Sequence, residues 1–118
     1  MKIDLSKSRV YVPKCMRNRK LPKDQQINVE YTLMTAEQEE RFSTMHLSRL
    51  GDDNMEMTVE THANEIWDAC VTKVNGLNDG EKPILDPKKV REIPGIYELI
   101  TEVAGIIKQG LTETDLKN

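Results

Sequence analysis

One segment of the chain alternates apolar and polar residues so regularly that a half-buried β-strand is its natural structure. In QINVEYTLM, residues 26–34, every second residue from the isoleucine to the leucine is apolar, and the residues between them are polar. Successive strand residues face opposite sides of a sheet, so this pattern places one face on a core. A weaker alternation over residues 3–12 stops at Pro13 and predicts a second strand. The two strands predict a hairpin whose long tip, residues 14–23, is a basic loop.

Helical patterns are expected in the middle of the chain. Thr35 and Gln38 have the spacing of a capping box, and they predict a helix that Gly51 ends. Residues 55–60 alternate and predict a short strand. From Thr61 onward, apolar residues recur at helical spacing and predict a second helix. The stripe and its C-terminal glycine cap are Ala63, Ile66, Trp67, Cys70, Val71, Val74 and Gly76.

The last part of the sequence completes an α+β pattern. Asp86-Pro87 is typical of a helix start, and it predicts a short helix that reaches Ile93 and breaks at Pro94-Gly95. A final helix over residues 96–107 has a broad apolar face. We therefore expect one α+β domain, with a small N-terminal antiparallel β-hairpin or sheet followed by a mostly α-helical part. Its segments are a basic β-arm (1–34), a mainly helical body (35–110) and a polar tail (111–118).

Charge is divided unevenly along the chain. Residues 1–23 hold eight of the 17 Lys/Arg and one of the 20 Asp/Glu, so this arm carries +7 and the remainder carries −10. Two copies could meet arm to body, or the arm could meet an acidic partner. We expect a homo-oligomer.

The cysteine and hydropathy patterns exclude several protein classes. Cys15 and Cys70 show neither CxxC nor paired-His spacing, which argues against a zinc site and a disulfide framework. The sequence contains neither an apolar signal segment nor an apolar run of membrane-spanning length. We therefore expect a soluble protein of a reducing cytoplasm without a membrane partner.

The segment KVNGLNDGEKPIL, residues 73–85, resembles a ligand loop at first sight. Aligned on its second glycine, however, the calcium-loop template requires an oxygen ligand where Leu77 stands. No GK[ST] sequence follows, which excludes a phosphate loop. Asn78-Asp79-Gly80 is typical of a tight turn. His46 and His62 fall on different predicted elements, so we expect no catalytic residue, no metal, no cofactor and no enzymatic activity.

Two sets of residues are candidates for binding a macromolecule. The basic loop carries Lys14, Arg17, Arg19, Lys20 and Lys23. It could neutralise phosphates, but it has no interleaved aromatic residues for stacking on bases, so a protein contact is the preferred interpretation and a nucleic-acid partner is not expected. On the helices, Trp67 and Tyr97 are candidate interface anchors, because both residue types are favoured at interfaces.

The C-terminal half, residues 63–118, resembles the small tail assembly chaperones of long-tailed phages and prophages. Those proteins run from an apolar helix through a turn of the form GL.D..G.PI and an LP or IP break to a last apolar helix and a Lys-Asn end. The corresponding residues here are Gly76-Leu77, Asp79-Gly80, Pro83-Ile84, Ile93-Pro94 and Lys117-Asn118.

The resemblance implies a non-enzymatic protein of the host bacterial cytoplasm. It would coat the long tape measure protein while tail tube subunits assemble around it. An apolar groove would make that contact, lined or supported by Trp67, Val71, Ile100 and Val103, and the basic arm would touch a neighbouring chaperone. Two alternatives stay open: a structural tail completion or connector protein of the virion, and a small nucleic-acid-binding regulator that uses residues 14–23.

Overall fold

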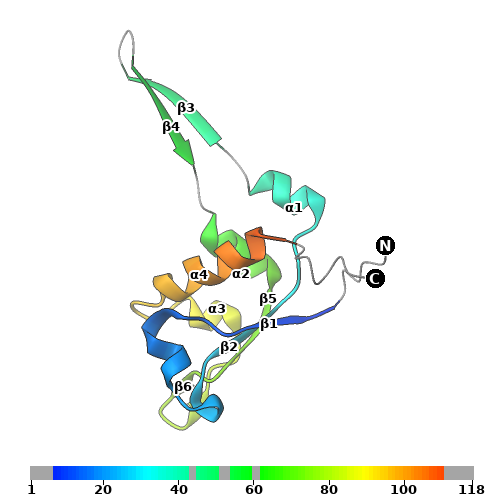
Figure 1. The fold of residues 1–118 in the computed structure, drawn as a ribbon, viewed down its shortest axis with the longest axis vertical. Coiled ribbons are helices and arrows are strands. Elements are labelled where there is room, and N and C mark those ends of the chain that lie inside the picture. Colours follow the sequence, from blue (N-terminus) through cyan, green and yellow to red (C-terminus); the bar gives the residue numbers. More distant parts are fainter. Residues whose placement is uncertain (1–6, 43–44, 51–53, 60–61, 111–118) are drawn as a thin grey trace.

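A three-stranded antiparallel sheet and the helices beside it form the body of the protein (Figure 1). The structure is a computed structural model that describes residues 7–42, 45–50, 54–59 and 62–110. The sheet has the order β1-β2-β5, with β1 at Arg9–Tyr11, β2 at Asn28–Tyr31 and β5 at Val71–Asn75. The predicted α+β class, with an N-terminal antiparallel sheet followed by helices, is therefore confirmed.

The register of the sheet explains the alternation in β2. Val29 faces Val74 of β5 and Tyr11 of β1, while Glu30 faces Lys73 on the other side of the sheet. Val29 and Val74 are buried, so the apolar face of β2 packs on the core as predicted. In the described part of the first predicted strand, residues 7–12, three residues pair with β2, and residues 3–6 lie outside the described residues.

The basic tip is not the plain loop that the sequence predicted. It forms two 3₁₀ helices, η1 at Cys15–Lys20 and η2 at Lys23–Gln25. The buried side chain of Asn18 organises this segment, because its Nδ2 donates to the carbonyls of Pro13 (2.9 Å) and Ile27 (2.8 Å). Its Oδ1 also accepts from the backbone N–H of Ile27 at 2.6 Å. The side chain of Asn18 thus supplies hydrogen bonds to the backbone in a segment where β1 and β2 no longer pair.

The helix that begins after Thr35 is much shorter than predicted. The capping box is confirmed, since Thr35 Oγ1 accepts from Gln38 N at 3.1 Å and Gln38 Oε1 accepts from Thr35 N at 3.0 Å. However, α1 covers only Ala36–Arg41 and contains no buried residue. The chain then forms an antiparallel hairpin of β3, Met45–Leu50, and β4, Asn54–Val59. The strand predicted over 55–60 is confirmed; the helix predicted up to Gly51 is wrong, because its apolar stripe was too thin to hold a helix on the body.

The second predicted helix is also shorter than expected. The helix α2 covers Ala63–Cys70, and β5 begins at the next residue, Val71. Pairing with β2 outweighs the helical period here, and Val71 and Val74 have β-branched side chains that suit a strand. Gly76 is therefore not a helix cap. It has a φ of +90°, and a Cβ on it would lie 2.4 Å from the carbonyl oxygen of Gln26, so only glycine fits.

The C-terminal elements follow the sequence closely. The predicted turn is confirmed as a small hairpin of β6, Asn78–Asp79, and β7, Lys82–Pro83. Asp86 caps α3, Pro87–Val90, by accepting from Lys88 N at 3.0 Å, but this helix ends before the predicted Ile93. The last helix, α4 at Tyr97–Lys108, is confirmed. The predicted polar tail, residues 111–118, lies outside the described residues.

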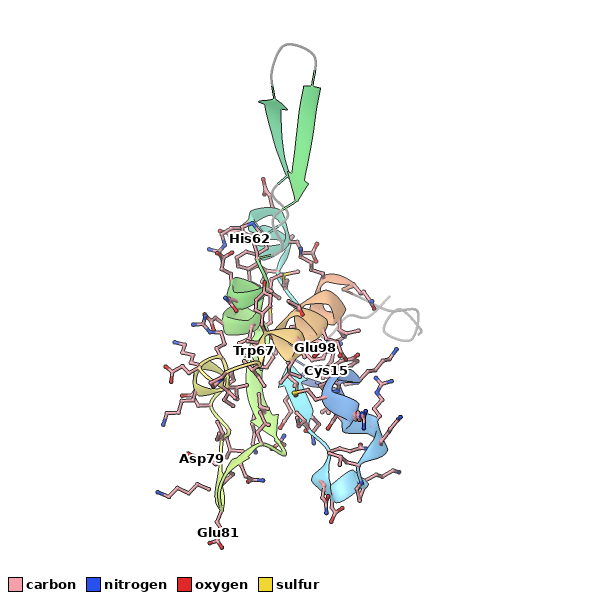
Figure 2. The ribbon with its side chains drawn as sticks, turned by 90° about the vertical axis from the view of Figure 1, so that its left-hand side faces the viewer. Cys15, His62, Trp67, Asp79, Glu81 and Glu98 are labelled. Atoms are coloured by element: carbon pink, nitrogen blue, oxygen red, sulfur yellow. The ribbon has the colours of Figure 1, made fainter. Side chains whose placement is uncertain are left out.

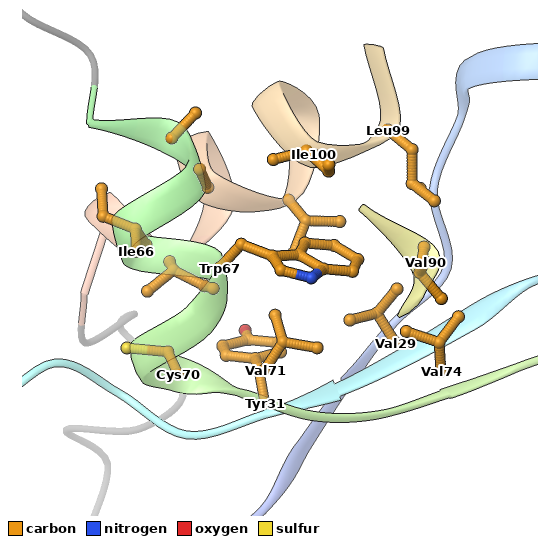
Figure 3. Close-up of a cluster of buried hydrophobic side chains, with 14 of the residues drawn as sticks. Val29, Tyr31, Ile66, Trp67, Cys70, Val71, Val74, Val90, Leu99 and Ile100 are labelled. Carbon is orange, nitrogen blue, oxygen red and sulfur yellow. The ribbon is translucent and has the colours of Figure 1, made fainter. Parts of the chain in front are cut away.

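Trp67 occupies the centre of the core (Figure 3). Its side chain is fully buried, and its Nε1–H donates to the carbonyl of Pro87 at 2.8 Å. The surrounding buried residues come from the sheet, from α3 and from α4: Val29, Val74, Val90, Leu99 and Ile100. One core therefore connects the strands with the three helices that follow β4.

Candidate protein-binding surfaces

The hairpin β3–β4 projects from the body as an arm (Figure 1). Within the described residues, the only substantial contacts of either strand are those with the other strand. An isolated two-stranded hairpin is marginally stable in water unless a further surface packs on it. This arm is therefore a candidate contact element.

The register of the arm divides its residues into two contrasting faces. Met45 is opposite Val59, Leu47 is opposite Met57, and Arg49 is opposite Met55. Facing residues of an antiparallel pair belong to the same face, so this face consists of apolar positions with one arginine. The alternate positions form the other, mostly polar face: His46, Ser48, Leu50, Asn54, Glu56 and Thr58.

An open hollow of about 590 Å³ lies near the point where the arm joins the body. Phe42, just before the arm, and His62, just after it, have ring centroids 6.0 Å apart. The guanidinium of Arg41 lies 4.9 Å from the centre of the Phe42 ring. Figure 2 shows His62 directly below the hairpin. Glu65, Asp68 and Ala69 of α2 complete the lining, so an apolar side chain entering this hollow would meet an aromatic floor with a charged rim.

A second surface is formed by η1 and η2, and we call it the basic platform. It consists of the exposed residues Lys14, Met16, Arg17, Lys20, Leu21 and Lys23. Met16 and Arg17 both have left-handed backbone conformations, with φ of 57° and 56°. Such conformations cost about 1–3 kcal/mol each in non-glycine residues and persist only where surrounding contacts enforce them.

Glu102 of α4 supplies some of the contacts that hold this segment in place. Its carboxylate accepts hydrogen bonds from the backbone N–H groups of Lys14 (2.7 Å) and Cys15 (2.9 Å) and from the hydroxyl of Tyr11 (2.6 Å). Burial alone would raise the pKa of Glu102, but the hydrogen bonds outweigh it and lower the pKa below its usual value. Burial and the Glu102 carboxylate raise the pKa of Tyr11 to about 12, so the phenol remains a donor at neutral pH. The last helix thus anchors the start of the platform.

We predict that Glu102→Gln weakens this anchor and flattens the acid limb of the stability profile. The folded-state pKa of Glu102 is below the unfolded value of about 4.3, so its contribution is present above that value and is lost as pH falls through the folded pKa. The variant should lose about 1–2 kcal/mol of unfolding free energy at neutral pH. Urea unfolding of both proteins at neutral and acid pH measures the difference; parallel pH profiles would contradict the prediction.

Most of the predicted groove residues lie inside the protein. Trp67, Val71, Ile100 and Val103 are buried in the core, so none of them lines an open surface groove. Tyr97 differs, because its side chain is 56% exposed at the start of α4. The correction has a simple cause: the two apolar stripes pack on each other and on the sheet.

The five basic residues of the predicted arm have two different environments. Lys14, Arg17, Lys20 and Lys23 are exposed, and within the described residues none of them forms an ion pair. Arg19 instead donates through Nε (3.0 Å) and a terminal nitrogen (2.8 Å) to the carbonyl of Val12. Four of the five predicted residues therefore belong to the platform surface, and the fifth holds the loop.

Only one strand of the arm, at residues 55–60, was predicted, and the anchor was not predicted. The alternation of Met45 and Leu47, followed by the turn-forming sequence GDDN at 51–54, was the available signal for the arm. No signal pointed to Glu102, because its partners are distant in sequence. The role of Asn18 was missed although its partners, Pro13 and Ile27, lie in the same segment.

Comparisons with protein-family models, with curated proteins and with solved structures found no match to this chain. In the part of the chain that the structure describes, no group of three or more His, Cys, Asp or Glu residues could hold a metal ion. No described helix has the length and apolar character needed to cross a bilayer. Function is therefore inferred from the two surfaces and from the sequence resemblance.

Proposed function

We propose that this chain is a phage tail assembly chaperone. It binds apolar stretches of the tape measure protein in the host cytoplasm and masks them until tail tube subunits replace it. The protein acts by binding alone and catalyses no reaction. The projecting β3–β4 arm is the observation that carries the proposal, because it is a ready contact element without a substantial contact to the described body.

The composition of the arm suits a partner whose sequence varies along its length. Met45, Met55 and Met57 share the apolar face with Leu47 and Val59. Methionine is flexible and polarisable, so a methionine-rich surface adapts to differently shaped apolar segments. A tape measure protein presents many such segments, and a chaperone must release each of them later. The hollow at the base of the arm offers a further position for an apolar side chain.

Most of the residues that carry the family resemblance lie between β5 and α4, while Lys117-Asn118 lies outside the described residues. Gly76-Leu77, Asp79-Gly80 and Pro83-Ile84 shape the β6–β7 hairpin, and Ile93-Pro94 lies between α3 and α4. These positions determine the path of the chain from the sheet to the last helix. Their role is structural, which supports a shared scaffold as the basis of the resemblance.

Co-expression with the tape measure protein of the same phage genome tests the proposal. The chain should keep that protein in the soluble fraction and co-purify with it. Replacing both Leu47 and Met57 with Glu should reduce the co-purified amount at least about tenfold, because charges placed on the apolar face must be desolvated on binding.

The matched control places the same two charges on the other face. His46 and Thr58 also face each other in the hairpin, so changing both to Glu adds like charges to a neighbouring rung. This variant should retain the tape measure protein. Equal loss in both variants, or an insoluble tape measure protein with the wild-type chain, would contradict the proposal. Recovery of the chain as a stoichiometric component of purified tails would instead indicate a completion or connector protein.

A further inference from the structure

The basic platform is a preformed surface. Asn18 and Glu102 form hydrogen bonds with its backbone. These contacts maintain the left-handed conformations of Met16 and Arg17. Two apolar side chains, Met16 at 46% and Leu21 at 43% exposure, lie in a segment with five exposed basic residues and the exposed Asp24. A loop that is already rigid loses little conformational entropy on binding, so the platform is suited to contact a partner.

The mixture of cations and aliphatic side chains indicates a protein partner. Single-stranded nucleic acids are held by exposed aromatic rings between cations. The Tyr11 ring, which the guanidinium of Arg19 approaches at 5.7 Å, is partly buried, and its hydroxyl donates to Glu102. An acidic protein surface that also accepts Met16 and Leu21 fits the platform better.

The helix α1 has the complementary properties. It contains no buried residue, although its capping box defines it well. A helix that is polar on every side contributes little to its own core. Glu37 and Glu40 are exposed and three positions apart, so they share one side of the helix. In Figures 1 and 2, α1 lies next to the arm, whereas η1 lies toward the other end of the body.

We propose that the basic platform of one copy binds α1 of a second copy. Lys14, Arg17, Lys20 and Lys23 meet Glu37 and Glu40, and Met16 and Leu21 cover the helix between them. The contact joins two different surfaces, so it is heterologous: an open row leaves one free platform and one free α1 at its ends, whereas a closed ring leaves neither. Such assemblies grow as rings or open rows. The inference concerns contacts between copies and does not depend on the tape measure protein.

Sedimentation velocity of the full chain tests this contact. The wild-type protein should self-associate at about 0.01 M salt, where the Debye length is about 30 Å, and dissociate at about 1 M salt, where it is about 3 Å. Reversing Arg17 and Lys20 together to Glu should weaken association at least about tenfold at low salt. The control reverses two exposed lysines elsewhere, Lys82 and Lys88, with the same change in net charge, and it should associate like the wild type.

A charge exchange distinguishes a specific contact from a general charge effect. A second variant reverses Glu37 and Glu40 to Lys, and it should also be monomeric alone. Mixing it with the Arg17/Lys20 variant should restore association, because the unaltered platform of one variant then meets the unaltered α1 of the other. Monomeric wild-type protein at low salt, or no recovery on mixing, would overturn the inference. Binding of a fluorescent oligonucleotide that is lost in the Arg17/Lys20 variant, without self-association, would overturn it in favour of a nucleic-acid surface.

Discussion

Trp67→Ala is expected to lower the free energy of unfolding by about 3–5 kcal/mol. The side chain is fully buried between α2, α4 and the sheet, and the substitution leaves a large cavity while also removing the donor to Pro87. Domains of this size have total stabilities of about 5–15 kcal/mol, so the variant should be close to unfolding at room temperature. Urea unfolding followed by far-ultraviolet circular dichroism measures this, since Trp67 is the only tryptophan and the variant has no indole fluorescence.

Trp67→Phe separates the two contributions. Phenylalanine fills much of the same volume but leaves the Pro87 carbonyl without its donor. The expected loss is about 1–3 kcal/mol, smaller than that of the alanine variant. An alanine variant with wild-type stability would show that this residue is not at the centre of the core.

Asn18→Ala is expected to have the next largest effect, a loss of about 2–4 kcal/mol, because it leaves buried backbone groups of Pro13 and Ile27 without their hydrogen bonds. The platform should also loosen, and trypsin should cleave it faster at Arg17, Arg19 and Lys20. Urea unfolding and timed proteolysis measure the two effects.

The control for this substitution lies in the same segment. Gln25 is exposed in η2, so Gln25→Ala should change stability by less than about 0.5 kcal/mol and leave proteolysis unchanged. If Asn18→Ala behaved like this control, the hydrogen bonds of Asn18 would not be what holds the platform.

The parts of the fold that the sequence predicted correctly depend on neighbouring residues. The capping box at Thr35, the cap at Asp86 and the tight turn at Asn78–Asp79 all depend on interactions within a few residues. Local chemistry is sufficient to define such features.

Some of the wrong predictions depend on partners that are distant in the sequence. Val71 and Val74 fit the helical stripe that begins at Ala63, and only pairing with β2, some forty residues earlier, makes them a strand. The same holds for the candidate sites. Trp67 became a core residue because α2 and α4 pack together, and the platform depends on Glu102, which lies 87 residues from Cys15.

The strand order of the sheet has a consequence for behaviour at high concentration. The outer side of β5 is partly covered, since Val74 N donates to the carbonyl of Leu85 at 3.2 Å, whereas no described strand pairs with the outer side of β1. An open edge of this kind is where sheets of separate molecules fuse into fibrils. Here the edge is only three residues long, it begins at the charged Arg9, and Pro13, which has no amide hydrogen, follows closely. A strand from another molecule would form too few backbone hydrogen bonds with β1 to remain bound. At high concentration, these molecules can therefore expose this edge without polymerising through it.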